Sequence, residues 1–215
     1  MSQNRWTHPL MAVALSLPLL AFYPWKTPKP EVRTGEAWDG KPMRVVLLPA
    51  TCASPDDACK DEFVQGLDGH VQSELEFAGY SVVRAEKLVA DVRSRDESDA
   101  ELKVLGVKVA EAASRTQVGS LFADLSPALQ RKLVAEAGAK GVLSARIQVG
   151  AKNGMSPTRE SVVMVRLGVG EDGAEVGWMA RCTVKSSLNP PLAQSLDYGS
   201  KCAVEGALTG KFKGK

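Results

Sequence analysis

The sequence predicts a single domain of the α/β (α+β) class, in which one mixed sheet of about five strands is covered by helices. Three observations lead to this fold class. Residues 44–50 form a continuous apolar run, which is typical of a central strand covered on both faces. Residues 126–149 pass from helical spacing to strict alternation. Two alternating segments, 161–169 and 176–184, flank a turn that contains glycine and predict a hairpin.

Residues 126–149 are the segment whose local structure is easiest to derive. Ser126 is a good N-cap, and Pro127 suits the first helical position, where a missing N–H costs nothing. Gly138 is expected to end the helix. A half-buried strand should follow, because apolar side chains occupy every second position: Leu143, Ala145, Ile147 and Val149.

The other elements follow from the same periodicities. Helical spacing predicts a first covering helix over 61–78, which carries Phe63, Leu67, Val71 and Leu75 at intervals of four. A short strand over 80–85 and helices within 86–125 should come next, and a helix over 192–208 should cover the hairpin. The predicted order is therefore β-α-β-α-α-β-β-β-α.

Residues 1–25 include an apolar run and predict a signal peptide or an N-terminal membrane anchor. The run is shorter than a spanning helix usually requires and Pro18 interrupts it, which favours a signal peptide. No pair of small residues marks a cleavage site, so an anchor stays open. Residues 26–42 are interpreted as a Pro-rich linker, 43–209 as the single α/β domain and 210–215 as a basic tail.

Charge and cysteine content narrow the environment of the domain. The formal net charge is only +2, and acidic and basic residues are interleaved, so we expect no nucleic-acid partner. Four cysteines in an exported chain predict two disulfides. Three pairings are open in principle, and pairing between sequence neighbours is favoured: Cys52 with Cys59, and Cys182 with Cys202. Their spacing does not resemble a zinc site, and we expect no metal.

The sequence contains little that predicts catalysis. Of the two histidines, His8 belongs to the N-terminal segment, so a catalytic base would have to be His70. His70 lies beside the apolar stripe of a helix, with Glu74 one turn away as an ion-pair partner. Gly168, Gly170 and Gly173 match a dinucleotide-binding pattern, but a strand follows them instead of a helix. We therefore expect no cofactor and no enzyme activity.

Several segments in chain order resemble a known family. They are VVLLPA, YSVVRAEKL, LQRKLVAEAGAKGVLSARI and the strand hairpin, which together span about residues 44–184. This succession resembles the periplasmic α/β domain of the TolB amino-terminal and CsgG (curli-export lipoprotein) type. The resemblance implies envelope assembly, export or transport without enzyme activity. The chain lacks the lipidation cysteine and the membrane hairpins of the curli-export proteins, which argues against a channel.

Together these observations predict a non-enzymatic interaction or assembly component of the cell envelope, exported to the periplasm or anchored facing it. Its partner would be one or more envelope proteins, and a homo-oligomer is left open. The solvent side of the hairpin and the loop beside it are the predicted docking residues: Arg166, Met179, Arg181, Pro190 and Pro191. The alternatives are a small exported hydrolase-like enzyme that uses His70, or a subunit of an oligomeric envelope pore.

Overall fold

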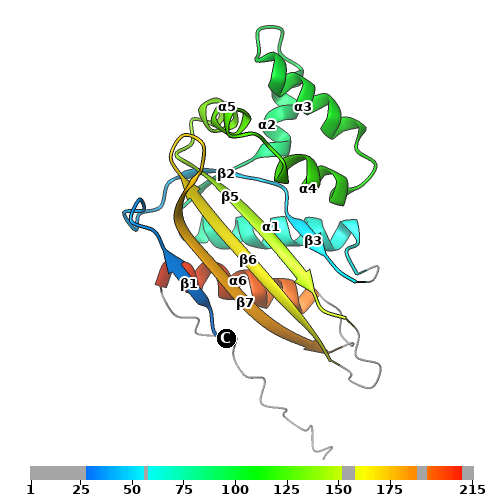
Figure 1. The fold of residues 1–215 in the computed structure, drawn as a ribbon, viewed down its shortest axis with the longest axis vertical. Helices are drawn as coiled ribbons and strands as arrows, with labels where there is room; N and C mark the ends of the chain where they lie inside the picture. The colour runs from blue at the N-terminus through cyan, green and yellow to red at the C-terminus, as the bar shows by residue number, and fades with distance from the viewer. Residues whose placement is uncertain (1–27, 56–57, 152–157, 188–192, 210–215) are drawn as a thin grey trace, which may run out of the picture.

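The computed structural model describes residues 28–55, 58–151, 158–187 and 193–209. The predicted signal or anchor segment, Pro190, Pro191 and the basic tail lie outside these ranges. The described residues form one mixed sheet with helices on both faces (Figure 1). The predicted fold class is therefore confirmed.

The sheet contains seven strands in the described part of the chain, in the order β1-β7-β6-β5-β2-β4, and β3 also pairs with β5. β2, β3 and β4 belong to the parallel part, whereas β5, β6, β7 and β1 are successively antiparallel. Their bounds are β1 Glu31–Thr34, β2 Arg44–Leu47, β3 Thr51–Ala53, β4 Ser81–Arg84, β5 Gly141–Val149, β6 Thr158–Val169 and β7 Glu175–Ser187.

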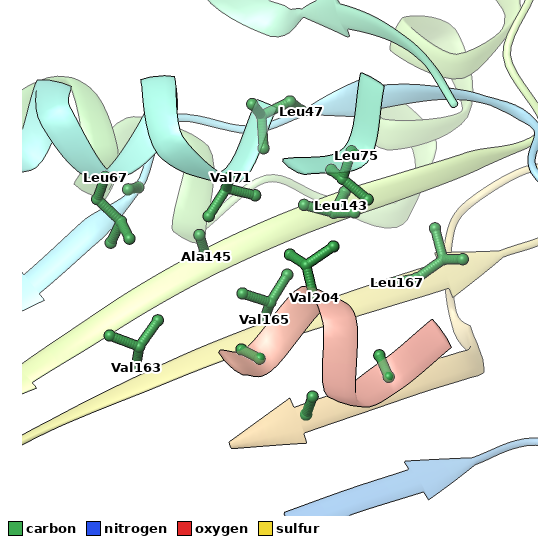
Figure 2. Packing of buried hydrophobic residues seen from close by; sticks show 14 of the residues in the cluster. Leu47, Leu67, Val71, Leu75, Leu143, Ala145, Val163, Val165, Leu167 and Val204 are labelled. Atoms are coloured by element: carbon green, nitrogen blue, oxygen red, sulfur yellow. The ribbon is translucent and has the colours of Figure 1, made fainter. Parts of the chain in front are cut away.

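Six helices within the described residues cover the sheet unevenly. They are α1 Asp61–Phe77, α2 Ala85–Arg93, α3 Ala100–Glu111, α4 Arg115–Ala123, α5 Pro127–Ala137 and α6 Ala193–Thr209. Helices α1 and α6 pack on one face, where they bury the larger apolar cluster (Figure 2). Helices α2 to α5 pack on the other face around Val46, Leu48 and Val142, which lie in β2, in the residue after it and at the start of β5.

The α5–β5 unit has the local structure that the sequence predicts. The Ser126 side chain accepts a hydrogen bond from the Leu129 N–H at 3.2 Å, and Pro127 occupies the first helical position. Gly138 ends the helix with a φ of 58°, a left-handed conformation that glycine adopts without strain. β5 then alternates, and its inward residues Leu143, Ala145 and Ile147 are buried in the larger cluster.

Residues 26–42, which the sequence analysis interprets as a linker, include the strand β1. β1 pairs antiparallel with β7, and Glu31 is opposite Arg181. The Gly35 N–H donates to the Gly177 carbonyl at 2.9 Å, so odd-numbered residues of this segment direct their N–H groups at β7. Pro30 therefore occupies a position whose N–H would point away from β7, and it costs the ladder no hydrogen bond. The ordered domain thus begins before residue 43.

The predicted strand over 44–50 was also too long. β2 ends at Leu47, although the N–H of Leu48 still donates to the Leu143 carbonyl at 2.9 Å. Pro49 has no N–H to continue the ladder, and the chain resumes pairing as the short strand β3 on β5. β1 and β3 account for the difference between about five predicted strands and the seven observed.

The hairpin and its covering helix have the predicted arrangement. Trp178 and Cys182 are fully buried, and α6 packs on both β6 and β7. Gly170 and Gly173 have φ values of 89° and 63°, so these glycines serve the turn between β6 and β7. In this place they do not open a helix over a dinucleotide.

Candidate functional site

Part of the sheet face that carries α2 to α5 has no helix over it. Val142 of β5 is covered by these helices, but the residues that follow it on the same side extend beyond them. Figure 1 shows β5, β6 and β7 in front of α1 and α6, with α2 to α5 gathered at one end. We call the uncovered side chains of β1, β5, β6 and β7 the open face: Glu31, Arg33, Ser144, Arg146, Gln148, Glu160, Val162, Met164, Arg166, Met179, Arg181, Thr183 and Lys185.

Arginine and methionine side chains alternate across the centre of the open face. Met164 of β6 lies in register between Arg146 of β5 and Arg181 of β7. In the neighbouring row, Met179 of β7 lies between Arg166 and Arg33. The methionines are half-buried, whereas Arg33, Arg146 and Arg181 are exposed. Because adjacent strands are about 4.8 Å apart, Arg146 and Arg181 project from backbones roughly 10 Å apart.

Most of the positive charge on the open face is not neutralised within the domain. Among the residues that the structure describes, Arg33, Arg146 and Arg181 form neither an ion pair nor a side-chain hydrogen bond. Lys185 does have a partner, since its Nζ lies 4.0 Å from the Glu160 Oε2. The open face therefore presents guanidinium groups that are available to a ligand.

Arg166 differs from the other arginines of the open face. Its Nη2 donates to the Gly173 and Ala174 carbonyls, at 3.3 and 3.0 Å, and so supports the turn of its own hairpin. A change at Arg166 would therefore disturb the local fold as well as the surface charge. Arg146 and Arg181 are the cleaner probes of docking.

The predicted docking residues are only partly brought together by the described structure. Arg166, Met179 and Arg181 share the open face, while Pro190 and Pro191 lie outside the described residues. Sequence reasoning missed Arg33, Arg146 and Met164. Alternation in the sequence indicates that Arg146 and Met164 occupy outward positions of their strands. It does not indicate the strand register that places them beside Arg181.

His70 lies in α1, on the helix layer behind the sheet, and has a different partner from the one predicted. Its Nδ1 is 3.5 Å from the Asp197 Oδ1 of α6, and its side chain is 40% exposed. No hydrogen bond joins it to a hydroxyl or thiol group of another described residue. A surface contact between α1 and α6 accounts for this arrangement, whereas an activated nucleophile would need an oriented base beside it.

A buried charge cluster lies where the chain leaves β2 and β4, and sequence reasoning missed it. The Asp68 carboxylate accepts from the Ala50 N–H at 2.7 Å and from Arg115 Nη2 at 3.0 Å. Arg115 also donates to Glu86, which lies 3.9 Å from Arg84. The cluster joins α1, α2, α4 and the corner between β2 and β3. Its members are far apart in sequence, so no local pattern announced it.

This cluster has one feature of an active site and lacks another. Burial raises the pKa of Asp68 to about 6, because desolvation outweighs the hydrogen bond from Ala50 and the charge of Arg115. The ends of neighbouring α/β strands are also common ligand positions. However, the space lined by Leu47, Pro49 and these side chains leaves no room for a water molecule. The cluster therefore holds α1, α2 and α4 against the corner between β2 and β3.

A groove of about 630 Å³ lies among α3, α4 and the start of α5. Its apolar lining comes from Val104, Leu105, Leu121, Leu125 and Leu129. Lys108 and Asp124 stand among the polar side chains that also line it, and these have opposite charges. The groove has room for a side chain, but no set of groups in it selects one class of ligand.

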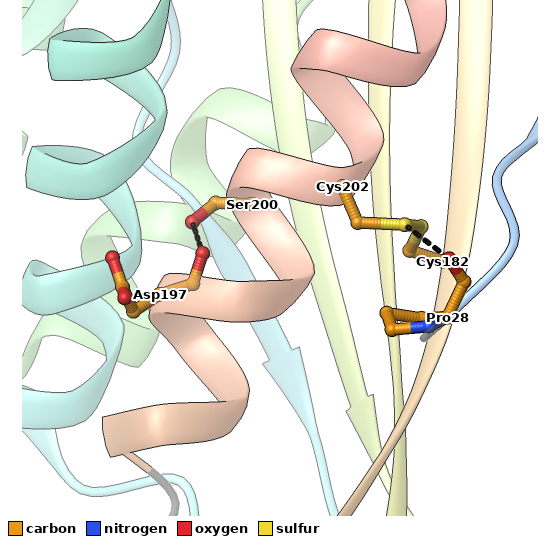
Figure 3. The surroundings of a disulfide bond; sticks show 5 residues. All are labelled: Pro28, Cys182, Asp197, Ser200 and Cys202. Atoms are coloured by element: carbon orange, nitrogen blue, oxygen red, sulfur yellow. Dashed lines mark hydrogen bonds between the residues drawn. A yellow bond between two sulfur atoms is a disulfide. The ribbon is translucent and has the colours of Figure 1, made fainter. Parts of the chain in front are cut away.

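Two disulfides hold the described domain together. Cys52 is bonded to Cys59 across the loop before α1, and Cys182 is bonded to Cys202, with Cα atoms 6.1 Å apart (Figure 3). The second bond fixes α6 on β7. Within the described residues there is no cluster of side chains that could hold a metal ion, and none of the helices there has the length and apolar character needed to cross a membrane.

Several solved structures are similar to the chain. PelC from Paraburkholderia phytofirmans, solved as a dodecamer, has a TM-score of 0.49 and 14% identity and covers 84% of this chain and 96% of its own. Lipoprotein GNA1162 from Neisseria meningitidis has a TM-score of 0.45 and 16% identity, and the match covers 72% of this chain and 90% of the lipoprotein chain. The C-terminal domain of LpoB from Salmonella enterica has a TM-score of 0.44 and 12% identity, and the match covers 69% of this chain and 88% of the LpoB chain.

No protein-family model matches the sequence, and no curated protein matches it. At the identities and TM-scores above, the likeness to solved structures is limited to the general course of the chain. The resemblance to the TolB and curli-export domains stays a prediction.

Proposed function

We propose that this protein is a non-enzymatic interaction component of the cell envelope, which docks a partner on its open face. The observation that carries the proposal is the open face, with three exposed arginines that lack partners among the described residues. The solvated face of an antiparallel sheet usually carries polar side chains. This face also carries two half-buried methionines between arginines that have no ion-pair partner among the described residues.

An oxidising compartment is supported by two independent features of the chain. The N-terminal apolar run has the composition of an export segment or an anchor. All four cysteines are paired in disulfides, which persist in exported proteins and are rare in the cytosol of mesophiles. Both features fit a domain that is exported to the periplasm or anchored facing it.

The first test is recovery of the partner from intact envelope after chemical cross-linking. The variant Arg146→Glu/Arg181→Glu should lose the cross-linked partner, because each change replaces attraction by repulsion at the centre of the open face. The matched control is Lys87→Glu/Lys140→Glu, which reverses the same amount of charge at two exposed lysines outside the open face. The control should retain the partner, and both variants should keep the circular-dichroism spectrum and melting temperature of the wild type.

Cross-linking and the cellular phenotype together separate docking from enzyme activity. If the open-face variant recovered the partner as well as the wild type did, docking at this face would be wrong. His70→Ala provides the other arm, because it removes the single histidine of the described domain and leaves the open face intact. Loss of the cellular phenotype in folded His70→Ala, with the open-face variant unaffected, would replace the docking proposal by the enzyme alternative.

A further inference from the structure

We infer that the partner presents an acidic amphipathic polypeptide segment to the open face, with carboxylates on either side of apolar side chains. The inference rests on the proposed docking function and specifies the chemistry of the ligand. It follows from the charge, the apolar content and the shape of the face, which are taken in turn below.

The charge of the face favours an anionic ligand. Arg33, Arg146 and Arg181 are exposed and have no acidic partner among the described residues. Glu31 lies opposite Arg181 in the register but forms no ion pair with it. Arginine binds carboxylates through two parallel hydrogen bonds, which gives orientation as well as attraction. A ligand with carboxylate groups therefore satisfies these side chains.

The two methionines of the open face indicate that the ligand carries apolar side chains as well as negative charge. Met164 and Met179 are half-buried between the arginines, so an ion that bound only the guanidinium groups would leave their thioether chains in water. Methionine packs well against apolar side chains of varied shape. A polar polyanion makes no use of these residues, whereas a polypeptide with apolar side chains between its acids does.

The shape of the open face favours a single polypeptide segment over a flat anionic surface. Arg146 pairs in register with Thr51 of β3, and α4 packs on β3. A Cβ on Gly119 of α4 would lie 2.7 Å from the Ala50 carbonyl oxygen, which shows how closely the helix approaches. The helical layer therefore stands beside the open face as a step about 10 Å high. A bilayer lying flat on the open face would meet this step before it reached Arg146, whereas one polypeptide segment can lie beside the step.

The spacing of the arginines suggests the pattern of the segment. Arg146 and Arg181 lie on strands separated by β6, roughly 10 Å apart, and Met164 lies midway. In an α-helix, residues i and i+7 are about 10 Å apart on one face, and residues i+3 and i+4 lie between them. A helix that crosses the three strands, with acids at i and i+7 and apolar residues at i+3 and i+4, matches this row.

Three probes test the inference on the purified full-length chain. The first is a fluorescent helical peptide with glutamate at i and i+7 and leucine at i+3 and i+4, together with a copy that has lysine in place of glutamate. The second is polyglutamate of similar length. The third is a set of phosphatidylcholine vesicles with and without phosphatidylglycerol. Fluorescence anisotropy and vesicle co-sedimentation measure binding by wild type and by Arg146→Glu/Arg181→Glu.

The glutamate–leucine peptide should bind, and the lysine peptide should not. Arg146→Glu/Arg181→Glu should weaken binding about tenfold or more, since two charge-assisted contacts become repulsive. Met164→Gln should weaken binding of the glutamate–leucine peptide but leave the weaker binding of polyglutamate unchanged. Binding should fall as salt rises, because exposed pairs are screened over about 8 Å at physiological ionic strength.

Three results would overturn the inference. One is polyglutamate binding as tightly as the amphipathic peptide, which would point to a polyanion. Another is sedimentation with anionic vesicles that depends on Arg146 and Arg181, which would point to a lipid surface. The third is that no probe binds. If no probe bound while the open-face variant still lost its cross-linked partner, the inferred chemistry would be wrong and the docking function would stand.

Discussion

Asp68 is the residue whose environment has the clearest consequence for stability. The side chain is 3% exposed, and its carboxylate holds the corner between β2 and β3 against α1 through Ala50 and Arg115. Burial raises its pKa from 3.8 to about 6. Between these pH values the folded state holds a proton that the unfolded state has released. The raised pKa of Asp68 therefore stabilises the folded state at the acidic end of this pH range. This contribution to the free energy of unfolding is lost as the pH rises.

The first prediction compares wild type with Asp68→Asn across this window. The free energy of unfolding of wild type relative to Asp68→Asn should fall as pH rises from about 4 to about 6, by up to roughly 3 kcal/mol for a shift of this size. Urea unfolding at a series of pH values gives the difference. A difference that is constant would mean that Arg115 and Ala50 balance the desolvation of Asp68, and one that grows with pH would mean that they outweigh it.

At the scale of helices, two glycines with different surroundings predict opposite effects. A Cβ on Gly106 of α3 would lie 2.6 Å from the Val89 carbonyl oxygen and 3.1 Å from the Arg93 Cβ, so α2 and α3 touch there. Gly69 of α1 has nothing within 4 Å of the same position. The contact between α2 and α3 thus depends on the absence of a side chain, whereas α1 has room for one.

The second prediction is that Gly106→Ala destabilises the protein by about 1–3 kcal/mol, because overpacking displaces one helix from the other. Gly69→Ala should instead stabilise it, by up to about 1 kcal/mol of helix propensity. Chemical denaturation of the two variants provides the comparison. Equal shifts in the same direction would show that α2 and α3 do not pack as closely as described.

The disulfides give the third prediction. Cys182 and Cys202 are 20 residues apart in sequence, and Cys52 and Cys59 are 7 apart. By the chain-entropy relation, removing the longer link should cost about 3 kcal/mol and removing the shorter one about 2 kcal/mol. The buried cysteines of the longer link add a cavity term in the same direction. Thermal unfolding of the two double-alanine variants should preserve this order, and a reversed order would contradict it.

The elements that could be predicted from sequence are those whose signals are local. The α5–β5 unit has a cap, a terminating glycine and strict alternation within 24 residues, and no distant contact was needed to identify it. β1 has one apolar residue, Val32, among charged and polar residues, and its partner β7 lies more than 140 residues later. β3 has only three residues. Pairing partners, rather than propensity, create these two strands.

The candidate site was less predictable than the fold for a related reason. Alternation shows that Arg166 and Arg181 lie on the outward side of their strands, but not which part of that side the helices leave bare. The Asp68–Arg115 pair joins residues 47 apart in sequence, and no spacing rule links them. Both features arise from the packing of α2 to α5 on one end of the sheet.

At the scale of the whole molecule, the start and end of the described domain are joined. A Cβ on Gly206 of α6 would overlap the Pro30 Cβ, and Cys202 Sγ lies 3.9 Å from the Pro28 carbonyl oxygen (Figure 3). The Trp38 ring contacts Trp178 edge-on, with centroids 6.5 Å apart. Residues before Met43 therefore complete the core around α6 and β7.

The fourth prediction concerns truncation. A chain that begins at residue 28 should fold with close to full stability, while one that begins at residue 43 should be less stable by about 2 kcal/mol or more, because it uncovers Trp178 and the edge of β7. Thermal unfolding of the two chains in oxidising buffer provides the test. Equal melting temperatures would show that β1 is dispensable and would restore the linker interpretation of residues 26–42.

The central claim is that the open face, rather than the helix layer, meets the partner. The most direct measurement is site-specific photo-cross-linking in living cells, with the photoreactive residue at Met164 on the open face or at Gln65, an exposed position of α1. Docking at the open face predicts a cross-linked adduct from position 164 that is lost in the Arg146→Glu/Arg181→Glu background, and no adduct from position 65. An adduct from position 65 alone, with both proteins folded and at equal abundance, would contradict the claim.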